Sequence, residues 1–269
     1  MNTARPCAIQ RPSLSLLGSE PLRAASEYLQ HRLHPSARVA NGDGHPVMFF
    51  PGFCTNERFL APLHQHCRSL GYHVLDWGCG YNFGPRGDLG VWVAELAEHA
   101  RRLLAGHRQR PTLVGYSLGG FYAREVAKLL PHKVRQVITI GTPFNAEADC
   151  SHAGWLFRIL SGAAQEFDHE QVIRLRSPPP VPTTSIYICA DGIVAWQICL
   201  HEGTDVLSQD IEIVGSHMGM PWNHEVFRVI EDRLAPRHGR WKPDVSAHAE
   251  PSGALRSPRR SASLPDTGC

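Results

Sequence analysis

The sequence lacks the features expected of a membrane-spanning protein or a nucleic-acid binder. It has no apolar run long enough to span a bilayer, so we expect no stable membrane insertion. The formal net charge is only +2, which argues against a dedicated nucleic-acid partner. Residues 1–7 also lack the charged segment and apolar core of a signal peptide.

Metal and nucleotide motifs are missing as well. The eight cysteines show no Cys-x-x-Cys spacing, so we expect free thiols in a reducing cytoplasm rather than a disulfide framework or a zinc site. The Gly-rich segment 78–87 contains neither Gly-Lys-Ser/Thr nor Gly-x-Gly-x-x-Gly, so it does not read as a phosphate-binding loop. We interpret it as one wall of a pocket, and we expect no cofactor and no metal.

One short motif organises the chain. Residues 115–119 read Gly-Tyr-Ser-Leu-Gly, preceded by the apolar pair Leu113-Val114 and followed by apolar residues at helical spacing in 121–130. A strand, a sharp turn and a helix form the setting that places a serine hydroxyl at the edge of a sheet as a nucleophile. The alternative is a Gly-rich turn that happens to contain Ser117, and the rest of the chain argues against it.

The hydrophobic pattern predicts an α/β domain with a mostly parallel central sheet and helices on both faces. We expect a disordered segment at 1–19, a folded domain at 20–235 and a disordered tail, poor in large apolar residues, at 236–269. The strands are expected at 47–50, 73–77, 112–114, 134–140, 184–189 and 210–214, and the main helices at 21–30, 59–70, 88–105, 121–130 and 222–234. The first of these helices is expected to bury Leu22, Ala25 and Leu29.

An insertion at about 146–177 interrupts this alternation. It carries an apolar helical face that includes Trp155, Leu156 and Ile159, which we interpret as a small helical cap lining the substrate pocket. The alternative is an ordinary crossover helix packed on the sheet.

Four residues that are candidates for catalytic roles follow four different strands. They are Phe53, Ser117, Asp191 and His217, and the carboxyl ends of parallel strands meet at one edge of a sheet. A serine hydroxyl needs a base, and a histidine base needs an acid to hold its other nitrogen. The backbone N–H groups of Phe53 and Leu118 are candidates for an oxyanion hole.

Other residues compete for these roles. His201, His224 and His169 are rival bases, but His217 lies in a Gly-flanked segment just after a strand. Asp205 is the rival acid, but Asp191 directly follows a strand and precedes Gly192.

With these pieces the chain resembles the α/β-hydrolase family, and within it the small lipase-like serine esterases of bacteria. The resemblance rests on Pro51-Gly52-Phe53, the segment 76–85, the Ser117 motif, Asp191-Gly192 and Ser216-His217. It implies an eight-stranded sheet or a trimmed version, and the six strands found leave out the first two antiparallel ones. Many relatives have His-Gly where this chain has Pro51-Gly52, but a backbone N–H does the work there.

The leading hypothesis is a serine hydrolase that cleaves carboxylic esters through an acyl-serine intermediate. Its partner is a small-molecule ester or acyl substrate, with no nucleic acid involved, and the sequence leaves the oligomeric state open. An acyltransferase or a thioesterase on the same fold is the first alternative. A non-catalytic binding protein is the second, although each member of the Ser-Asp-His set is present.

Overall fold

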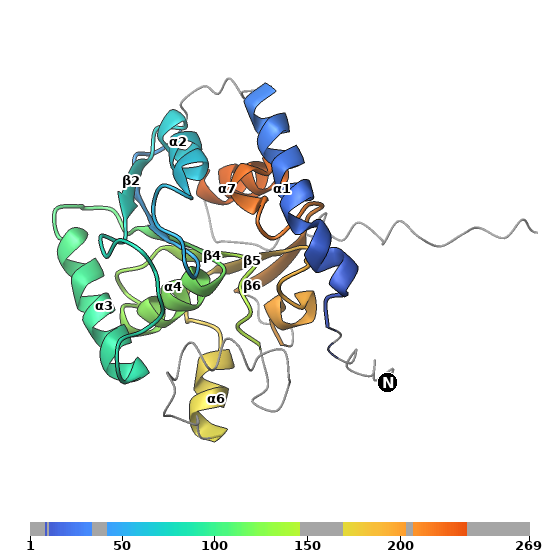
Figure 1. Ribbon diagram of the computed structural model, residues 1–269. Helices are drawn as coiled ribbons and strands as arrows, with labels where there is room; N and C mark the ends of the chain where they lie inside the picture. Colours follow the sequence, from blue (N-terminus) through green and yellow to red (C-terminus); the bar gives the residue numbers. More distant parts are fainter. Residues whose placement is uncertain (1–8, 10, 34–41, 146–168, 203–206, 236–269) are drawn as a thin grey trace, which may run out of the picture.

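The computed structural model describes residue 9 and residues 11–33, 42–145, 169–202 and 207–235 (Figure 1). Its centre is a six-stranded sheet in the order β2-β1-β3-β4-β5-β6, with every neighbouring pair parallel. The strands are β1 Pro46–Phe50, β2 His73–Asp76, β3 Thr112–Tyr116, β4 Gln136–Ile140, β5 Thr183–Tyr187 and β6 Ser208–Glu212. The expected parallel sheet of six strands is therefore confirmed.

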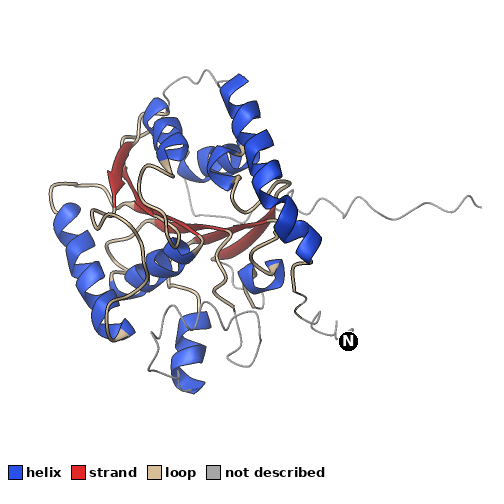
Figure 2. Cartoon of the chain, viewed as in Figure 1, coloured by secondary structure: helices blue, strands red, loops and turns tan. Residues whose placement is uncertain are grey.

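Helices cover both faces of this sheet (Figures 1 and 2). Helices α1, α2 and α7 lie on one side, and α3 and α4 lie on the other. The helices are α1 Leu14–Leu33, α2 Ala61–Ser69, α3 Leu89–Leu103, α4 Leu118–Leu129, α6 His169–Arg176 and α7 His224–Leu234, with short 3-10 turns η2 Trp196–Cys199 and η3 Met220–Trp222. No helix among these residues is long and apolar enough to cross a bilayer.

The alternation of side chains along each strand divides the core in two. Met48 and Phe50 of β1 face α3 and α4, where they pack with Phe121 and Val93. Val47 and Phe49 point to the opposite side and belong to the cluster that includes Phe227 of α7. Because both faces are covered, the central strands β1, β3 and β4 are buried along their whole length and are mostly apolar, as parallel strands usually are.

The sheet order fixes where a ligand site can form. The chain runs from β1 outward to β2, then crosses back to β3 on the other side of β1. The strand order thus reverses between β1 and β3, and crevices at the carboxyl ends of the strands form at such reversals. Ser117 directly follows β3 at this point.

Helix α1 differs from the sequence-based expectation in two ways. It begins at Leu14 rather than near Pro21, because Ser13 caps it: its Oγ accepts the N–H of Leu16 at 3.2 Å. Residues 14–19, expected to be disordered, are therefore helical. The predicted apolar face is also wrong, since Leu22 and Leu29 are 77% and 58% exposed.

Part of the expected insertion at 146–177 is described. Helix α6 buries Val172 and Leu175, and Leu175 joins the core cluster that includes Phe121 and Val181. The candidate pocket residues Trp155, Leu156 and Ile159 lie outside the described residues, as does the expected tail at 236–269.

Candidate active site

Ser117 stands at the turn between β3 and α4 in a backbone conformation that side-chain-bearing residues rarely adopt. Its φ is 51° and its ψ is −123°. The turn is held by the Ser117 N–H, which donates to Ile140 O at 2.8 Å, and by Thr142 Oγ1, which donates to Ser117 O at 2.9 Å. A Cβ on Gly119 would collide with the backbone of Phe50, so the following helix can approach β1 only with glycine there.

Asp191 lies in the segment that follows β5 and is 3% exposed. Its Oδ1 accepts the N–H groups of Ile193 and Val194, each at 2.7 Å. Its Oδ2 is thereby left to face His217, whose Nδ1 is 2.6 Å away. The local turn thus orients the carboxylate without help from another side chain.

His217 lies in the segment after β6 and is also 3% exposed. Its Nε2 is 3.2 Å from Ser117 Oγ, so the three side chains form one hydrogen-bonded row. Burial by itself lowers the pKa of His217, but the charge of Asp191, the hydrogen bond to it and the charge of Glu20 outweigh burial and raise the pKa above 6.5. Ser117, Asp191 and His217, singled out in the sequence, are thus brought together.

The segment after β1 lies beside the serine. A Cβ on Gly52 would approach Cβ of Ser117 to 3.2 Å and the Tyr116 ring to 2.8 Å, so the close passage depends on glycine. Phe53 follows at the surface, 37% exposed. Its N–H and the N–H of Leu118, at the start of α4, make no hydrogen bond to another described residue. Both donors are therefore free to serve a ligand.

Asn82 fastens this segment, a role that sequence reasoning missed. It is fully buried, and its Nδ2 donates to Pro51 O at 2.7 Å. Its backbone carbonyl accepts the N–H of Cys54 at 2.7 Å, and its N–H donates to Thr55 O at 2.9 Å. The sequence signal was a lone asparagine within a Gly-rich stretch, which is typical of a turn as well as of a buried clamp.

Two acidic residues of α1 were also missed. Glu20 is 1% exposed and accepts hydrogen bonds from the N–H groups of Gly192, His217 and Met218. Glu27 accepts the N–H of Ser216 at 2.8 Å and its hydroxyl at 3.0 Å. Desolvation raises the pKa of Glu27, and the hydrogen bonds from Ser216 oppose that shift. The available signal was their spacing of seven residues, which places both on one face of a helix.

The rival residues serve elsewhere or are not described. The His201 ring pairs with Asp210 at 2.6 Å and lies 3.1 Å from the guanidinium of Arg124, away from Ser117. His224 is the first residue of α7, where its ring packs against Phe227. Asp205 and the side chain of His169 lie outside what the structure describes.

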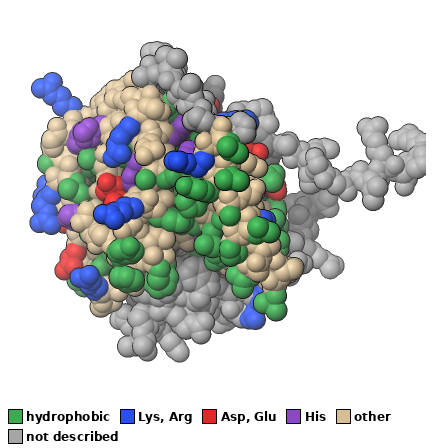
Figure 3. Space-filling view, turned by 45° about the horizontal axis from the view of Figure 1, so that its top comes forward, with side chains coloured by type: hydrophobic (Ala, Val, Ile, Leu, Met, Phe, Trp, Pro, Cys, Tyr) green, Lys and Arg blue, Asp and Glu red, His purple; other side chains and the backbone are tan. Residues whose placement is uncertain are grey.

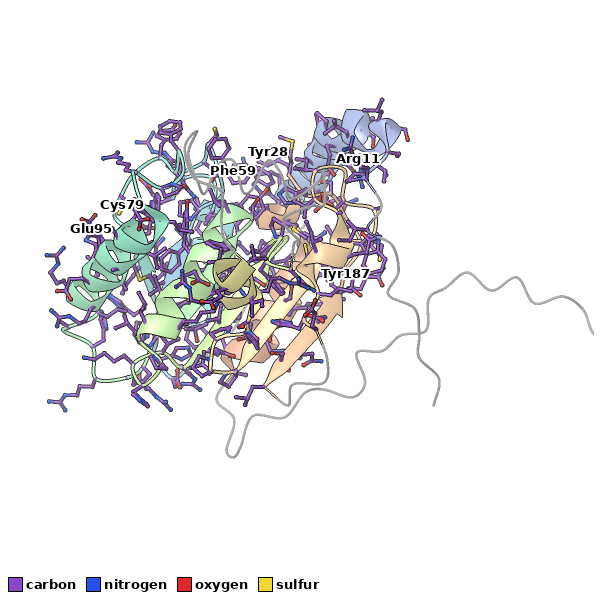
Figure 4. All side chains as sticks on the ribbon, turned by 90° about the horizontal axis from the view of Figure 1, so that it is seen from below. Arg11, Tyr28, Phe59, Cys79, Glu95 and Tyr187 are labelled. Carbon is purple, nitrogen blue, oxygen red and sulfur yellow. The ribbon has the colours of Figure 1, made fainter. Side chains whose placement is uncertain are left out.

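The Gly-rich segment 78–87, expected to be a pocket wall, lines a cavity of about 1070 Å³ beside α3. Trp77, Tyr81, Phe83 and Trp92 contribute aromatic surface, and Cys79 and Glu95, both labelled in Figure 4, also line it. Among the described residues, Ser117, Asp191 and His217 do not line it. This cavity is thus a different surface from the serine site. Figure 3 shows that hydrophobic side chains spread widely over one face of the molecule.

Comparison with known protein families agrees with this architecture. A family model described as the alpha/beta hydrolase fold matches residues 45–162. Lipase B of Aspergillus fumigatus has a similar structure, with a TM-score of 0.56 and 17% sequence identity over 76% of this chain and 56% of that chain. At that identity the likeness concerns the fold.

Two curated relatives have similar sequences. The mouse palmitoyl-protein thioesterase ABHD10, mitochondrial, is 23% identical over 198 residues, which cover 62% of this chain and 66% of the relative. The pimeloyl-[acyl-carrier protein] methyl ester esterase of Shewanella woodyi is 28% identical over 123 residues, which cover 45% of each chain. The matched part therefore spans less than two thirds of either relative.

Proposed function

Because the chain belongs to the α/β-hydrolase family, we propose that it is a serine hydrolase that cleaves carboxylic esters through an acyl-serine intermediate. The observation that carries the proposal is the buried row of Ser117, His217 and Asp191, joined at 3.2 Å and 2.6 Å. Each group has the partner that nucleophilic catalysis by serine requires.

In the first half-reaction, Ser117 Oγ attacks the acyl carbon while His217 Nε2 takes its proton. Asp191 accepts the hydrogen of His217 Nδ1, so the imidazole keeps Nε2 free as the base and its positive charge is stabilised. His217 then gives the proton to the departing alcohol. In the second half, water attacks the acyl-serine while His217 takes a proton of that water. His217 then returns the proton to Ser117 Oγ as the acyl C–O bond breaks and the carboxylic acid leaves.

The developing oxyanion needs donors that are already in place. We assign this role to the N–H groups of Phe53 and Leu118, which have no partner among the described residues. Leu118 is the first residue of α4, so the partial positive charge of the helix N-terminus supports the same anion. Asn82 keeps the Phe53 segment in position through its bond to Pro51 O.

The test is covalent labelling by a fluorophosphonate combined with hydrolysis of p-nitrophenyl esters. Wild type is expected to label at Ser117, and Ser117→Ala and His217→Ala to lose kcat on the order of 10⁶. Asp191→Asn is expected to lose on the order of 10⁴, because the histidine adopts the wrong tautomer. Asp210→Asn, which touches the rival His201, is the matched control and retains activity. Wild-type turnover in folded Ser117→Ala would refute the nucleophile.

The pH dependence adds a second test. His217 acts as a base only when neutral, and its pKa is raised above 6.5 by Asp191 and Glu20 against the effect of burial. We therefore expect kcat/KM to fall as the pH drops, with an apparent pKa above 6.5.

A thioesterase is the second candidate, favoured by the longer alignment with the mouse palmitoyl-protein thioesterase than with the methyl ester esterase, 198 against 123 residues. The same row of side chains attacks a thioester as readily as an ester. Measuring kcat/KM for matched acyl thioesters and oxygen esters of the same chain length separates the two, because the acyl pocket contributes equally to both.

Two finer points remain proposals. Trp155, Leu156 and Ile159 are assigned to the acyl pocket on their sequence pattern alone, and an ester series of increasing acyl length on Leu156→Ala tests this.

A reducing compartment such as the cytoplasm is supported by Cys54, Cys67, Cys79, Cys189 and Cys199, which are all free thiols.

A further inference from the structure

One buried carboxylate of α1 joins the two segments that carry the acid and the base. Glu20 Oε1 accepts the N–H of Gly192 at 2.9 Å and the N–H of His217 at 3.2 Å. Its Oε2 accepts the N–H of Met218 at 3.1 Å. Gly192 is the neighbour of Asp191, so a single side chain fixes the backbone beside both partners of the 2.6 Å hydrogen bond.

Arg23, one turn further along α1, binds the same two segments as a hydrogen-bond donor, whereas Glu20 binds them as an acceptor. Its Nη2 pairs with Glu20 at 2.7 Å. Its Nη1 donates to Ala190 O and to Gly215 O, each at 2.9 Å. The segment of Asp191 therefore gives one N–H to Glu20 and the segment of His217 gives two, and each segment gives one carbonyl to Arg23, which makes the contact specific for this ion pair.

The two segments approach α1 so closely that side chains would not fit. A Cβ on Gly192 would lie 2.6 Å from the backbone of Leu16 and 2.8 Å from Cγ of Glu20. A Cβ on Gly219 would collide with the carboxylate of Glu27. The helix is thus seated against glycines that flank the acid and the base.

We propose that Glu20 is a positioning residue for the reaction, holding the segment of Asp191 and the segment of His217 at the separation that keeps their hydrogen bond and the bond to Ser117 intact. The inference rests on the proposed function of these three residues. It adds a residue from α1 that does not touch the reacting atoms and acts through the backbone of the acid and the base.

Glu20 also contributes charge to the site. The titratable and charged groups around His217 come from three parts of the fold: Asp191 after β5, Tyr116 of β3, whose hydroxyl donates to His217 O, and Glu20, Arg23 and Glu27 of α1. Burial lowers the pKa of His217, whereas Asp191 and then Glu20 raise it. Removing the charge of Glu20 must therefore move this pKa downward.

The experiment compares two substitutions at one position. Glu20→Gln removes the charge and keeps the length, whereas Glu20→Asp keeps the charge and is one methylene too short to reach all three N–H groups. Two controls remove the same charge elsewhere. Glu98→Gln lies on the outer face of α3, where Glu98 pairs with Arg101. Glu27→Gln lies on the same side of α1 and contacts Ser216 rather than His217.

The readouts are kcat and KM per fluorophosphonate-titrated site, the acid limb of kcat/KM, and the imidazole pKa of His217 by NMR. Glu20→Gln is expected to lower that pKa and the acid limb by several tenths of a unit or more. Its kcat should fall about ten- to a hundredfold, with KM within about twofold. Glu20→Asp should lose kcat with the acid limb unmoved. Glu98→Gln should leave the pKa of His217 unshifted, and Glu27→Gln should shift it less than Glu20→Gln does.

Wild-type kcat per titrated site and an unmoved His217 pKa in Glu20→Gln, even with a lower melting temperature, would reduce Glu20 to a structural brace and overturn the proposal. If Glu20→Gln does not fold, the kcat values of Glu20→Asp and Arg23→Lys test the positioning role instead. Both variants keep the charge, so a loss of kcat supports positioning and a wild-type kcat overturns it. If wild type neither labels nor turns over, the proposed function has failed. The NMR pKa of His217 in Glu20→Gln then still tests the electrostatic contact.

Discussion

Helices α1 and α7 lie on the same side of the sheet and are held there by opposite chemistry (Figure 1). Helix α7 buries an apolar face, with Val226 and Ile230 fully buried and Phe227 2% exposed. Helix α1 buries Glu20 and Ala24 and leaves Leu22 and Leu29 in solvent. Apolar packing dominates at α7, whereas α1 relies on hydrogen bonds to backbone groups, with added ring contacts of Tyr28 to Trp222 and of His31 to Phe227.

The difference lies in what each helix is packed against. Helix α7 covers side chains of the sheet, and any apolar side chain of suitable size contributes there. Helix α1 covers the segments around Asp191 and His217, whose exposed groups are N–H and C=O. A buried backbone N–H must find an acceptor, and here the helix supplies the carboxylates of Glu20 and Glu27. Stability of the core and geometry of the site should therefore respond to different mutations.

The largest expected effect is on the apolar helix. Phe227→Ala should lower the free energy of unfolding by about 3–5 kcal/mol, because Phe227 packs in the core with its ring 5.5 Å from that of His31. Urea unfolding followed by circular dichroism measures this. The pKa of His217 in the folded protein should stay as in wild type. A cost below about 1 kcal/mol would mean that α7 is not held by apolar packing.

Gly219→Ala should have an intermediate effect. The backbone at Gly219, with φ −84° and ψ −13°, accommodates alanine, so the cost comes from the clash with Glu27 and from Ser216 Oγ at 2.6 Å. We expect a loss of about 1–3 kcal/mol, as for other overpacked sites. Gly106→Ala, where a Cβ would meet nothing within 4 Å, is the matched control. Adding Glu27→Ala should recover part of the loss, and strict additivity in this double-mutant cycle would exclude the proposed clash.

Glu27 should make the docking of α1 depend on pH. Desolvation raises its folded pKa above 4.5, against the hydrogen bonds from Ser216 and Asn223. A carboxyl whose pKa is raised in the folded protein stabilises the fold below pH 4.5, and this contribution is lost as the pH rises through the pKa of the folded state. Glu27→Gln does not titrate, so its stability relative to wild type should improve as the pH rises from below 4.5 toward neutrality. Thermal melts across this range measure it, and a trend in the other direction would reverse the assigned shift.

The smallest effect is expected on the outer face of α1. Leu29→Ser and Leu22→Ala should each change the free energy of unfolding by no more than about 0.5 kcal/mol, because these side chains are already in solvent. Differential scanning fluorimetry measures the melting temperatures of both variants, which should stay close to wild type while that of Phe227→Ala falls. A loss of about 2 kcal/mol at either leucine would show that this face packs against something.

The sequence predicted what depends on periodicity and motif. The six strands, helix α7 and the turn at Ser117 could be read from apolar spacing and from glycines that permit close approach. Helix α1 could not, because its leucines suggested the buried face, whereas its docking depends on acceptors for backbone groups about 170 to 200 positions away. Asn82 escaped for the same reason: its partners Pro51 and Cys54 become neighbours only in the folded chain.

The contact between Glu20 and Met218 spans 198 positions of the chain. A ribosome makes α1 early and the segment of His217 late, so the helix has to wait for most of the domain before it can dock. Asp191 and His217 are therefore aligned only when the domain is nearly complete. A truncated product that ends before Gly215 lacks His217, the proposed base, and the backbone groups that bind Glu20 and Arg23 of α1. If the proposed function holds, ester turnover in a cell-free translation reaction should appear only after this segment has left the ribosome.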